Sequence, residues 1–197
     1  NGYIYGVSQI VDNATNWLDP YSAIYAKWDS DGSLLWNRTL DLAQFYEFIP
    51  INIWAGSTGV FICGIARESM FANNMAFLTK IDGNSGNILW TNNVSTGEGA
   101  TAVHLTGIGA YIYTVGEAEL GEDASKAPPE TQLFLVKWDA SSGSVINAYL
   151  WDANAASYED VCDIWSDGLS LFIAGSMWGY NEEYMGNIPQ GFVAKLS

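Results

Sequence analysis

Basic residues are scarce in this sequence, which has 7 Lys plus Arg against 22 Asp plus Glu among 197 residues and a formal net charge of −15 at pH 7. Nucleic acids are bound mainly by Lys and Arg side chains that neutralise phosphates. Anionic membrane surfaces attract the same side chains. We therefore expect neither nucleic acid nor a membrane surface as a partner.

Long apolar runs and cysteine motifs are missing as well. No apolar run approaches the roughly 20 residues that a membrane-spanning helix needs, so we expect no membrane insertion. Cys63 and Cys162 are the 2 cysteines of the chain, and their wide separation matches no metal-binding or redox motif. We expect both to be buried free thiols that do not pair with each other.

Motifs that bind phosphates or carry a nucleophile are also absent, because the sequence contains no P-loop, dinucleotide fingerprint or Gly-x-Ser-x-Gly elbow. His104 lies in an apolar stretch, and we interpret it as a core or channel-lining residue. The acid pairs Glu182 with Glu183, Glu117 with Glu119, and Asp160 with Asp163 have the residue types of glycoside hydrolysis. Neighbouring acids are common in an acidic chain, so we assign no catalytic and no metal-binding residue.

What the sequence does contain is a repeat. Its phase is given by Lys27, Lys80, Lys137 and Lys195, at spacings of 53, 57 and 58 residues. In the first three copies an Asp- and Gly-containing turn and an apolar run follow the lysine, as in Leu34-Leu35-Trp36. Short runs rich in Val, Ile, Tyr, Phe and Trp between such turns are typical of β-strands.

Four-stranded units that repeat every 40 to 60 residues are typical of β-propeller blades. We therefore predict one all-β, propeller-like domain over residues 1–197, with four blades at about 1–42, 43–97, 98–152 and 153–197. The first strand of a unit is expected near Ile51, Ala100 and Tyr158; the second near Tyr3, Val60, Tyr111 and Leu171; the third near Ala23, Met75, Leu133 and Gly191; the fourth near Leu34, Ile88 and Val145.

These assignments leave the first unit without its first strand and the last unit without its fourth, so 14 strands are expected. Unpaired strand edges accept strands from elsewhere. We therefore expect the residues to be an excerpt of a longer propeller, or the blades to be completed by neighbouring subunits in a self-assembly.

The pattern of Lys27-Trp28-Asp29, a turn with Gly32, and Leu34-Leu35-Trp36 resembles the repeat of bacterial and archaeal cell-surface β-propellers, the seven-bladed propeller repeat. It is also similar to pyrroloquinoline-quinone-like propeller repeats. The resemblance implies a secreted, modular scaffold and no particular reaction.

The recurring residues have structural interpretations. We expect Trp28, Trp36, Trp90 and Trp138 to pack between blades, since one Trp buries about 150 to 250 Å². We expect the stem of each repeat lysine to pack along its sheet and the ammonium to pair with an acid of the adjoining blade. Residues 29–33 resemble part of a calcium loop without its bidentate Glu. We interpret them as a turn and expect no cofactor, with calcium as the alternative.

Binding residues are expected in the long connections between second and third strands, because long loops on a rigid scaffold often carry binding sites. These connections are rich in acids and in amphipathic aromatics, which suit a glycan, a cationic protein or a divalent cation. The candidates are Asp12, Trp17, Asp19, Tyr21, Glu117, Glu119, Trp178, Tyr180, Glu182, Glu183 and Tyr184.

Asn13, Asn37 and Asn93 are N-glycosylation acceptors by sequence. With the scarce basic residues and the surface-type repeat, they indicate an extracellular or cell-surface glycoprotein. We expect a non-catalytic scaffold that binds a protein or a glycan. The alternatives are a carbohydrate-active or quinoprotein-like enzyme fragment, and a structural subunit of a surface layer or filament.

Overall fold

The computed structural model of the chain describes residues 2–10, 22–119, 131–151, 158–181 and 186–196. These residues form 14 β-strands and no helix, arranged in four antiparallel sheets. The described part of the chain therefore contains no helix that could cross a membrane. The all-β prediction and the predicted number of strands are confirmed.

Each sheet is a meander in which consecutive strands pair. The first sheet contains β1 (Ile4–Ile10), β2 (Ser22–Trp28) and β3 (Leu34–Leu40), and the second contains β4 (Glu47–Gly56), β5 (Gly59–Arg67), β6 (Met75–Ile81) and β7 (Ile88–Val94). The third contains β8 (His104–Ile108), β9 (Tyr111–Glu119), β10 (Thr131–Asp139) and β11 (Val145–Trp151), and the last contains β12 (Tyr158–Ser166), β13 (Leu171–Asn181) and β14 (Gly186–Leu196).

One strand begins later than predicted. The strand expected near Ala100 is β8, which starts at His104, and Ala100 makes only an isolated bridge to Ala118. The reason is local: the Thr101 hydroxyl, 2.9 Å from the backbone nitrogen of Glu117, accepts its hydrogen bond. A side chain thus occupies a place in the ladder that a regular strand would give to a carbonyl.

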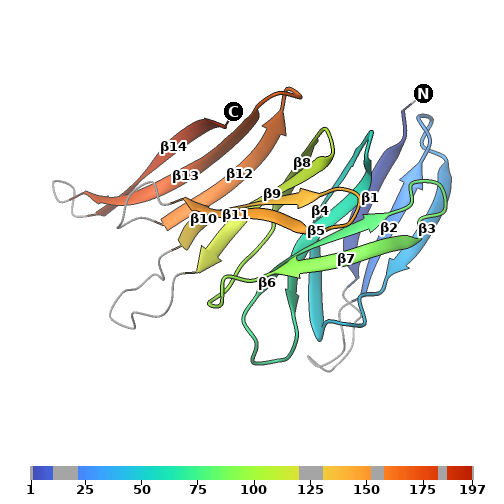
Figure 1. Cartoon of the computed structure of the whole chain (residues 1–197), viewed down its shortest axis with the longest axis horizontal. Coiled ribbons are helices and arrows are strands. Elements are labelled where there is room, and N and C mark those ends of the chain that lie inside the picture. Colours follow the sequence, from blue (N-terminus) through green and yellow to red (C-terminus); the bar gives the residue numbers. More distant parts are fainter. Residues whose placement is uncertain (1, 11–21, 120–130, 152–157, 182–185, 197) are drawn as a thin grey trace.

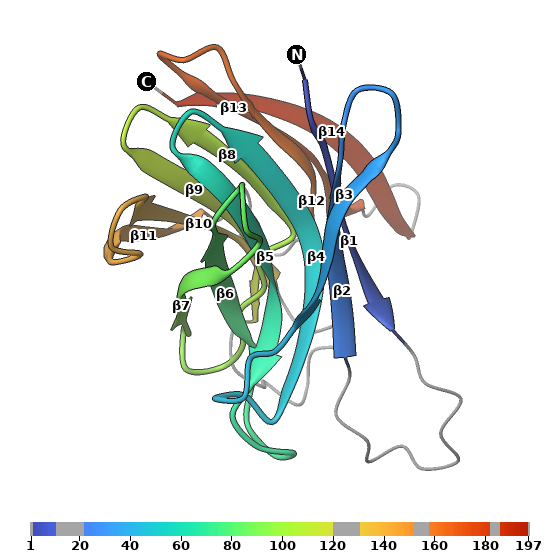
Figure 2. The ribbon, with the colours of Figure 1, turned by 90° about the vertical axis from the view of Figure 1, so that its right-hand side faces the viewer.

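The four sheets follow one another across the molecule, from the blue N-terminal sheet to the red C-terminal one (Figure 1). Their faces pack through three apolar clusters, one at each junction between consecutive sheets. At the central junction Phe61 and Leu78 of the second sheet pack with Val136 and Trp138 of the third. Figure 2 shows the same sheets from the side, each twisted relative to the next.

The predicted packing of tryptophan between repeats is found at Trp138 of the central junction, and at Trp36 and Trp90. A Cβ on Gly86 would meet the Trp36 ring at 3.1 Å, and one on Gly143 would meet the Trp90 ring at 2.7 Å. Both glycines lie in the turn between the third and fourth strands of the next sheet, with φ of 75° and 74°. These turns therefore need glycine for the backbone conformation and for the close approach of the ring.

The predicted acidic partner is wrong for the repeat lysines Lys27 and Lys80. The Lys27 ammonium donates to the carbonyl of Gly83 at 2.7 Å, and the Lys80 ammonium to the carbonyl of Ala140 at 2.8 Å. Each ammonium thus binds a backbone carbonyl in the next sheet's turn, not an acid. The acid of that turn is occupied locally: Asp82 Oδ1, for example, accepts hydrogen bonds from the backbone of Asn84 and Ser85.

The cysteines are both free, but only Cys63 is buried, because Cys162 is exposed on β12. The turn at Asp29 behaves as predicted, since its carboxylate accepts hydrogen bonds from the backbone of Asp31 and Ser33. Of the glycosylation acceptors, Asn37 is exposed on the edge strand β3 and Asn93 is half-buried on the edge strand β7. Asn13 lies outside the described residues.

Candidate functional site

The candidate site lies where second strands end and first strands begin. Glu117 is near the end of β9, and Asp160 is near the start of β12. In the neighbouring second sheet the same end carries the connections at residues 68–74 and 95–103, joined where the Ala100 backbone N–H donates to the carbonyl of Asn74. The short hairpins between first and second strands lie at the other end.

The structure describes only part of the predicted binding set. Glu117 and Glu119 are described with their side chains, and Trp178 and Tyr180 are placed on β13, where their backbones pair with Pro189 and Asn187 of β14. The predicted binding residues outside the described part of the chain are Asp12, Trp17, Asp19, Tyr21, Glu182, Glu183 and Tyr184.

Glu117 and Asp160 form a hydrogen-bonded carboxyl pair across the junction between the third and last sheets. Burial, the charge of Asp160, the hydrogen bond with its side chain and the charge of Glu119 together raise the pKa of Glu117 to about 7, and burial is the largest of these causes. Two like charges this close cannot both ionise readily. Glu117 therefore keeps its proton up to near-neutral pH beside Asp160.

A row of three polar residues, Asn52, His104 and Asp163, runs beside the carboxyl pair on the first strands β4, β8 and β12. His104 Nδ1 lies 3.3 Å from Asn52 Nδ2 and 3.6 Å from Asp163 Oδ1. The three residues occupy equivalent positions in successive repeats. Their pairing partners on the second strands are Cys63, Val115 and Ala174, and each partner directly precedes a glycine. We call them the polar row.

β-Bulges in two of these strands, β4 and β12, set the direction of the side chains in the polar row. The pairing of β4 shifts between Pro50 and Asn52, and that of β12 shifts between Val161 and Asp163. A bulge adds one residue and turns the following side chain to a new direction. His104 Nδ1 therefore lies between the side-chain amide of Asn52 and the carboxylate of Asp163.

Glu159 holds β12 in place beside the carboxyl pair. Its side chain is buried, and its Oε2 accepts a hydrogen bond from the backbone of Leu133 at 3.1 Å. The Thr131 hydroxyl donates to the Glu159 carbonyl at 3.1 Å. These bonds join the last sheet to the third next to Asp160, so the position of the pair is fixed by the scaffold.

The site offers hydrogen-bond donors and acceptors, and Glu117 keeps its proton there up to near-neutral pH. Among the described residues, no group of three or more His, Cys, Asp or Glu side chains is arranged to hold a metal ion. The described part of the site can therefore bind hydroxyl or amide groups, and it can accept a single positive charge.

Sequence reasoning missed the carboxyl pair because it grouped acids that are close in the chain. Glu117 was matched with Glu119, and Asp160 with Asp163, whereas the structure pairs residues of two different repeats. The repeat phase was the signal that could have found the pair. Glu117 follows the glycine of one second strand, and Asp160 lies on the neighbouring first strand of the next repeat.

No protein-family model and no curated protein matches this chain.

Proposed function

We propose that the chain is part of an extracellular β-propeller scaffold that binds a glycan at the end of the sheets carrying the carboxyl pair. The observations that carry this proposal are the carboxyl pair at that end and the polar row on the first strands of three consecutive sheets. Carboxylates, amides and imidazoles are the groups that hydrogen-bond sugar hydroxyls. A protein ligand is the alternative occupant of the same surface.

Several observations support a propeller arrangement of the blades. The sheets pack face to face through apolar clusters, and equivalent lysines reach equivalent turns of the next sheet. The first strands β4, β8 and β12 contact one another in turn. In a propeller such strands line the centre of the ring, and ligands are bound there or by the connecting loops.

The geometry of the carboxyl pair favours binding over glycoside hydrolysis. Retaining glycosidases hold their two carboxyl groups about 5 to 5.5 Å apart, and inverting enzymes about 6.5 to 9.5 Å apart. Glu117 and Asp160 are in direct hydrogen-bond contact. A pair in contact is closer than the pairs of either class of glycosidase, so we expect binding without cleavage.

The test is a glycan array probed with the full chain, followed by a reducing-end assay on each glycan that binds. We expect Glu117→Gln to weaken binding at least tenfold because it replaces the carboxyl group of Glu117 with an amide. Asp31→Asn is the matched control: it makes the same change of charge on an exposed turn at the other end of the sheets.

Release of reducing ends would contradict the binding function. A blank array, or equal effects of the two substitutions, would contradict a glycan site at this end.

A further inference from the structure

The connection between β5 and β6 presents two large apolar side chains to solvent. The Ala72 backbone N–H donates to the carbonyl of Ser69 at 3.1 Å, so Met70 and Phe71 are the central residues of a β-turn. Phe71 is 93% exposed and Met70 is 47% exposed. Such turn positions usually carry Gly, Pro, Asn, Asp or Ser. Neither turn chemistry nor core packing therefore accounts for Phe71.

Hydrogen bonds on both sides hold this connection in place. Arg67 Nε donates to Asn74 Oδ1 at 2.7 Å and so closes the base of the loop. The Asn73 side-chain amide donates to the carbonyl of Gly97 at 2.8 Å, which ties the loop to the next connection. Phe71 is thus presented by a braced loop, and less conformational entropy is lost when a ligand binds to it.

The loop is also joined to the carboxyl pair, through one intervening backbone segment. Ala100 donates its N–H to the carbonyl of Asn74 at 2.9 Å, and it forms a bridge with Ala118, the residue after Glu117. Paired backbones lie about 4.8 Å apart, so two such spacings place the backbones of Asn74 and Ala118 about 10 Å apart. The loop and the carboxyl pair are therefore parts of one surface.

A second aromatic side chain lies at the base of the loop. Tyr46 is 43% exposed, and its backbone N–H donates to the carbonyl of Arg67 at 2.8 Å. Exposed amide side chains, Gln44 and Asn73, are carried by the same two connections. The face of an aromatic ring carries partial negative charge and packs against the polarised C–H groups of a sugar ring. Aromatic faces among amides and carboxylates are the chemistry that recognises a glycan.

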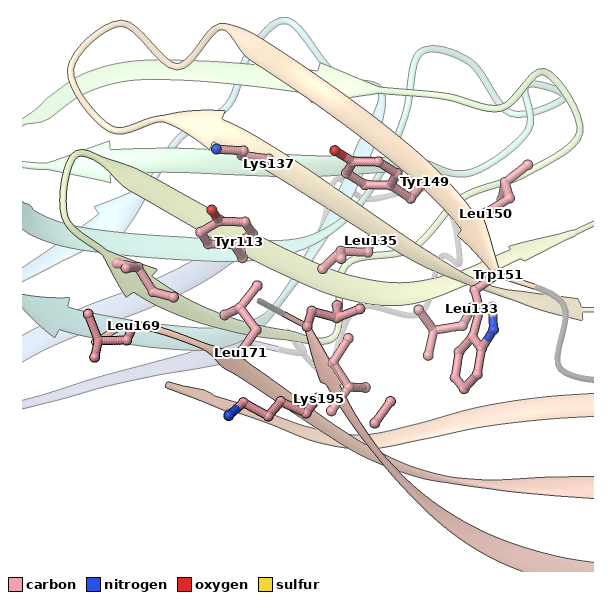
Figure 3. Close-up of a pocket in the computed structure, with 14 residues that line it drawn as sticks. Tyr113, Leu133, Leu135, Lys137, Tyr149, Leu150, Trp151, Leu169, Leu171 and Lys195 are labelled. Atoms are coloured by element: carbon pink, nitrogen blue, oxygen red, sulfur yellow. The ribbon is translucent and has the colours of Figure 1, made fainter. Parts of the chain in front are cut away.

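The groove between the third and last sheets lacks this combination. It has a volume of about 750 Å³, and Figure 3 shows Tyr113, Tyr149, Lys137 and Lys195 in its largely apolar lining. No carboxylate and no side-chain amide is among the described residues that line it. The groove therefore does not offer the groups that the loop and the carboxyl pair offer together.

We propose that Phe71 is the stacking platform of the glycan site and that the site takes a glycan of several sugar units. One sugar ring packs on the Phe71 face, while hydroxyls of another unit bind the carboxyl pair across the intervening segment. This inference rests on the proposed glycan-binding function, and it adds the residue that makes binding depend on glycan length.

The experiment uses the full chain and an array of cello-, xylo-, manno- and chito-oligosaccharides, each from the disaccharide to the hexasaccharide. Affinities for the series that binds are then measured by calorimetry. We expect the hexasaccharide to bind at least tenfold more tightly than the disaccharide, because only the longer glycan reaches both Phe71 and Glu117. Phe71→Ala should remove this difference, whereas Glu117→Gln should weaken the binding of both lengths.

Two further variants identify the contact as stacking. Phe71→Leu keeps an apolar side chain but has no flat face, so it should lose most of the hexasaccharide affinity that Phe71→Ala loses. Tyr149→Ala is the matched control, because it removes an aromatic side chain that is 49% exposed in the groove of Figure 3. It should bind as the unchanged chain does. Thermal unfolding of Phe71→Ala should match the unchanged chain, since the side chain is exposed.

Tight hexasaccharide binding that Phe71→Ala or Phe71→Leu retains would overturn the stacking role and leave the glycan function standing. Equal losses in Phe71→Ala and Tyr149→Ala would overturn it as well. An array on which the unchanged chain binds no oligosaccharide would contradict the glycan function itself, and this inference with it.

Discussion

Glu117 links the protonation of the candidate site to the stability of the fold. An acid whose pKa is higher in the folded state holds its proton more tightly there. The stability it contributes is therefore complete below its ordinary pKa of 4.5 and is lost as the pH rises through about 7. The fold is thus most stable while Glu117 is protonated.

Glu117→Gln should remove this dependence. We expect the free energy of unfolding of the unchanged chain to fall between pH 4.5 and 7 by about 1 kcal/mol more than that of the variant, a value reduced for the partial exposure of the carboxyl group. Urea unfolding at several pH values measures it. Glu119→Gln, on an exposed side chain of the same strand, is the control and should keep most of the slope; identical slopes for Glu117→Gln and the unchanged chain would refute the coupling.

The repeat lysines provide a second test on single side chains. Lys80→Met keeps the apolar stem and removes the donor to Ala140, so we expect a loss of about 1 to 2 kcal/mol in the free energy of unfolding. Lys195→Met is the matched control at the same repeat position, because Lys195 has no hydrogen-bonded carbonyl among the described residues. Its effect should stay within about 0.5 kcal/mol. Equal losses would show that the carbonyl bond contributes nothing.

The turns between third and fourth strands join one sheet to the next. Gly32, Gly86 and Gly143 hold the same place in three such turns, and all have positive φ. Only the latter two meet a tryptophan of the preceding sheet, while a Cβ on Gly32 would meet nothing within 4 Å. Gly32 is therefore needed only for its positive φ. Gly86 and Gly143 are needed both for positive φ and for the space that the tryptophan ring occupies.

This difference separates backbone strain from packing. Gly32→Ala should cost about 1 kcal/mol, the usual penalty for a side chain at positive φ. Gly143→Ala should cost about 2 kcal/mol or more, because its Cβ also displaces Trp90 and the amide of Asn92. Thermal unfolding of the two variants makes the comparison. Similar losses in both would mean that the Trp90 contact does not stabilise the junction.

The whole molecule is a series of sheets in which each buries its faces only against its neighbours. The stability of such an array is approximately the sum of the stabilities of its repeats and of the interfaces between neighbouring repeats. Cys63 lies completely buried in the second sheet, and burial raises the pKa of its thiol. Cys162 lies exposed in the last sheet. The two thiols therefore report on the interior and on the surface of the array.

Reaction with an aromatic disulfide reagent in native buffer should modify Cys162 rapidly and leave Cys63 unreacted. In urea both should react, because unfolding exposes the buried thiol and returns its pKa to the ordinary range. Mass spectrometry of the labelled peptides identifies each site, and Cys162→Ser is the control. Prompt native labelling of Cys63 would show that the second sheet opens without global unfolding.

Local features of this protein were determined by its sequence. The repeat phase, the number of strands, and the turns at Asp29 and Gly32 depend on residues that are near one another in the chain. Strand propensity and turn chemistry act over the same short distances, so these predictions could be made without a structure.

Contacts between repeats were decided only by the tertiary structure. The carboxyl of Glu117 meets Asp160, and the ammonium of Lys80 meets the carbonyl of Ala140, in each case across a junction between sheets. Neither pairing has a signal in local spacing, because it depends on how closely the sheets approach and on the bulges that re-aim side chains. The chain thus encodes its strands and turns locally, whereas the raised pKa of Glu117 exists only once the sheets pack.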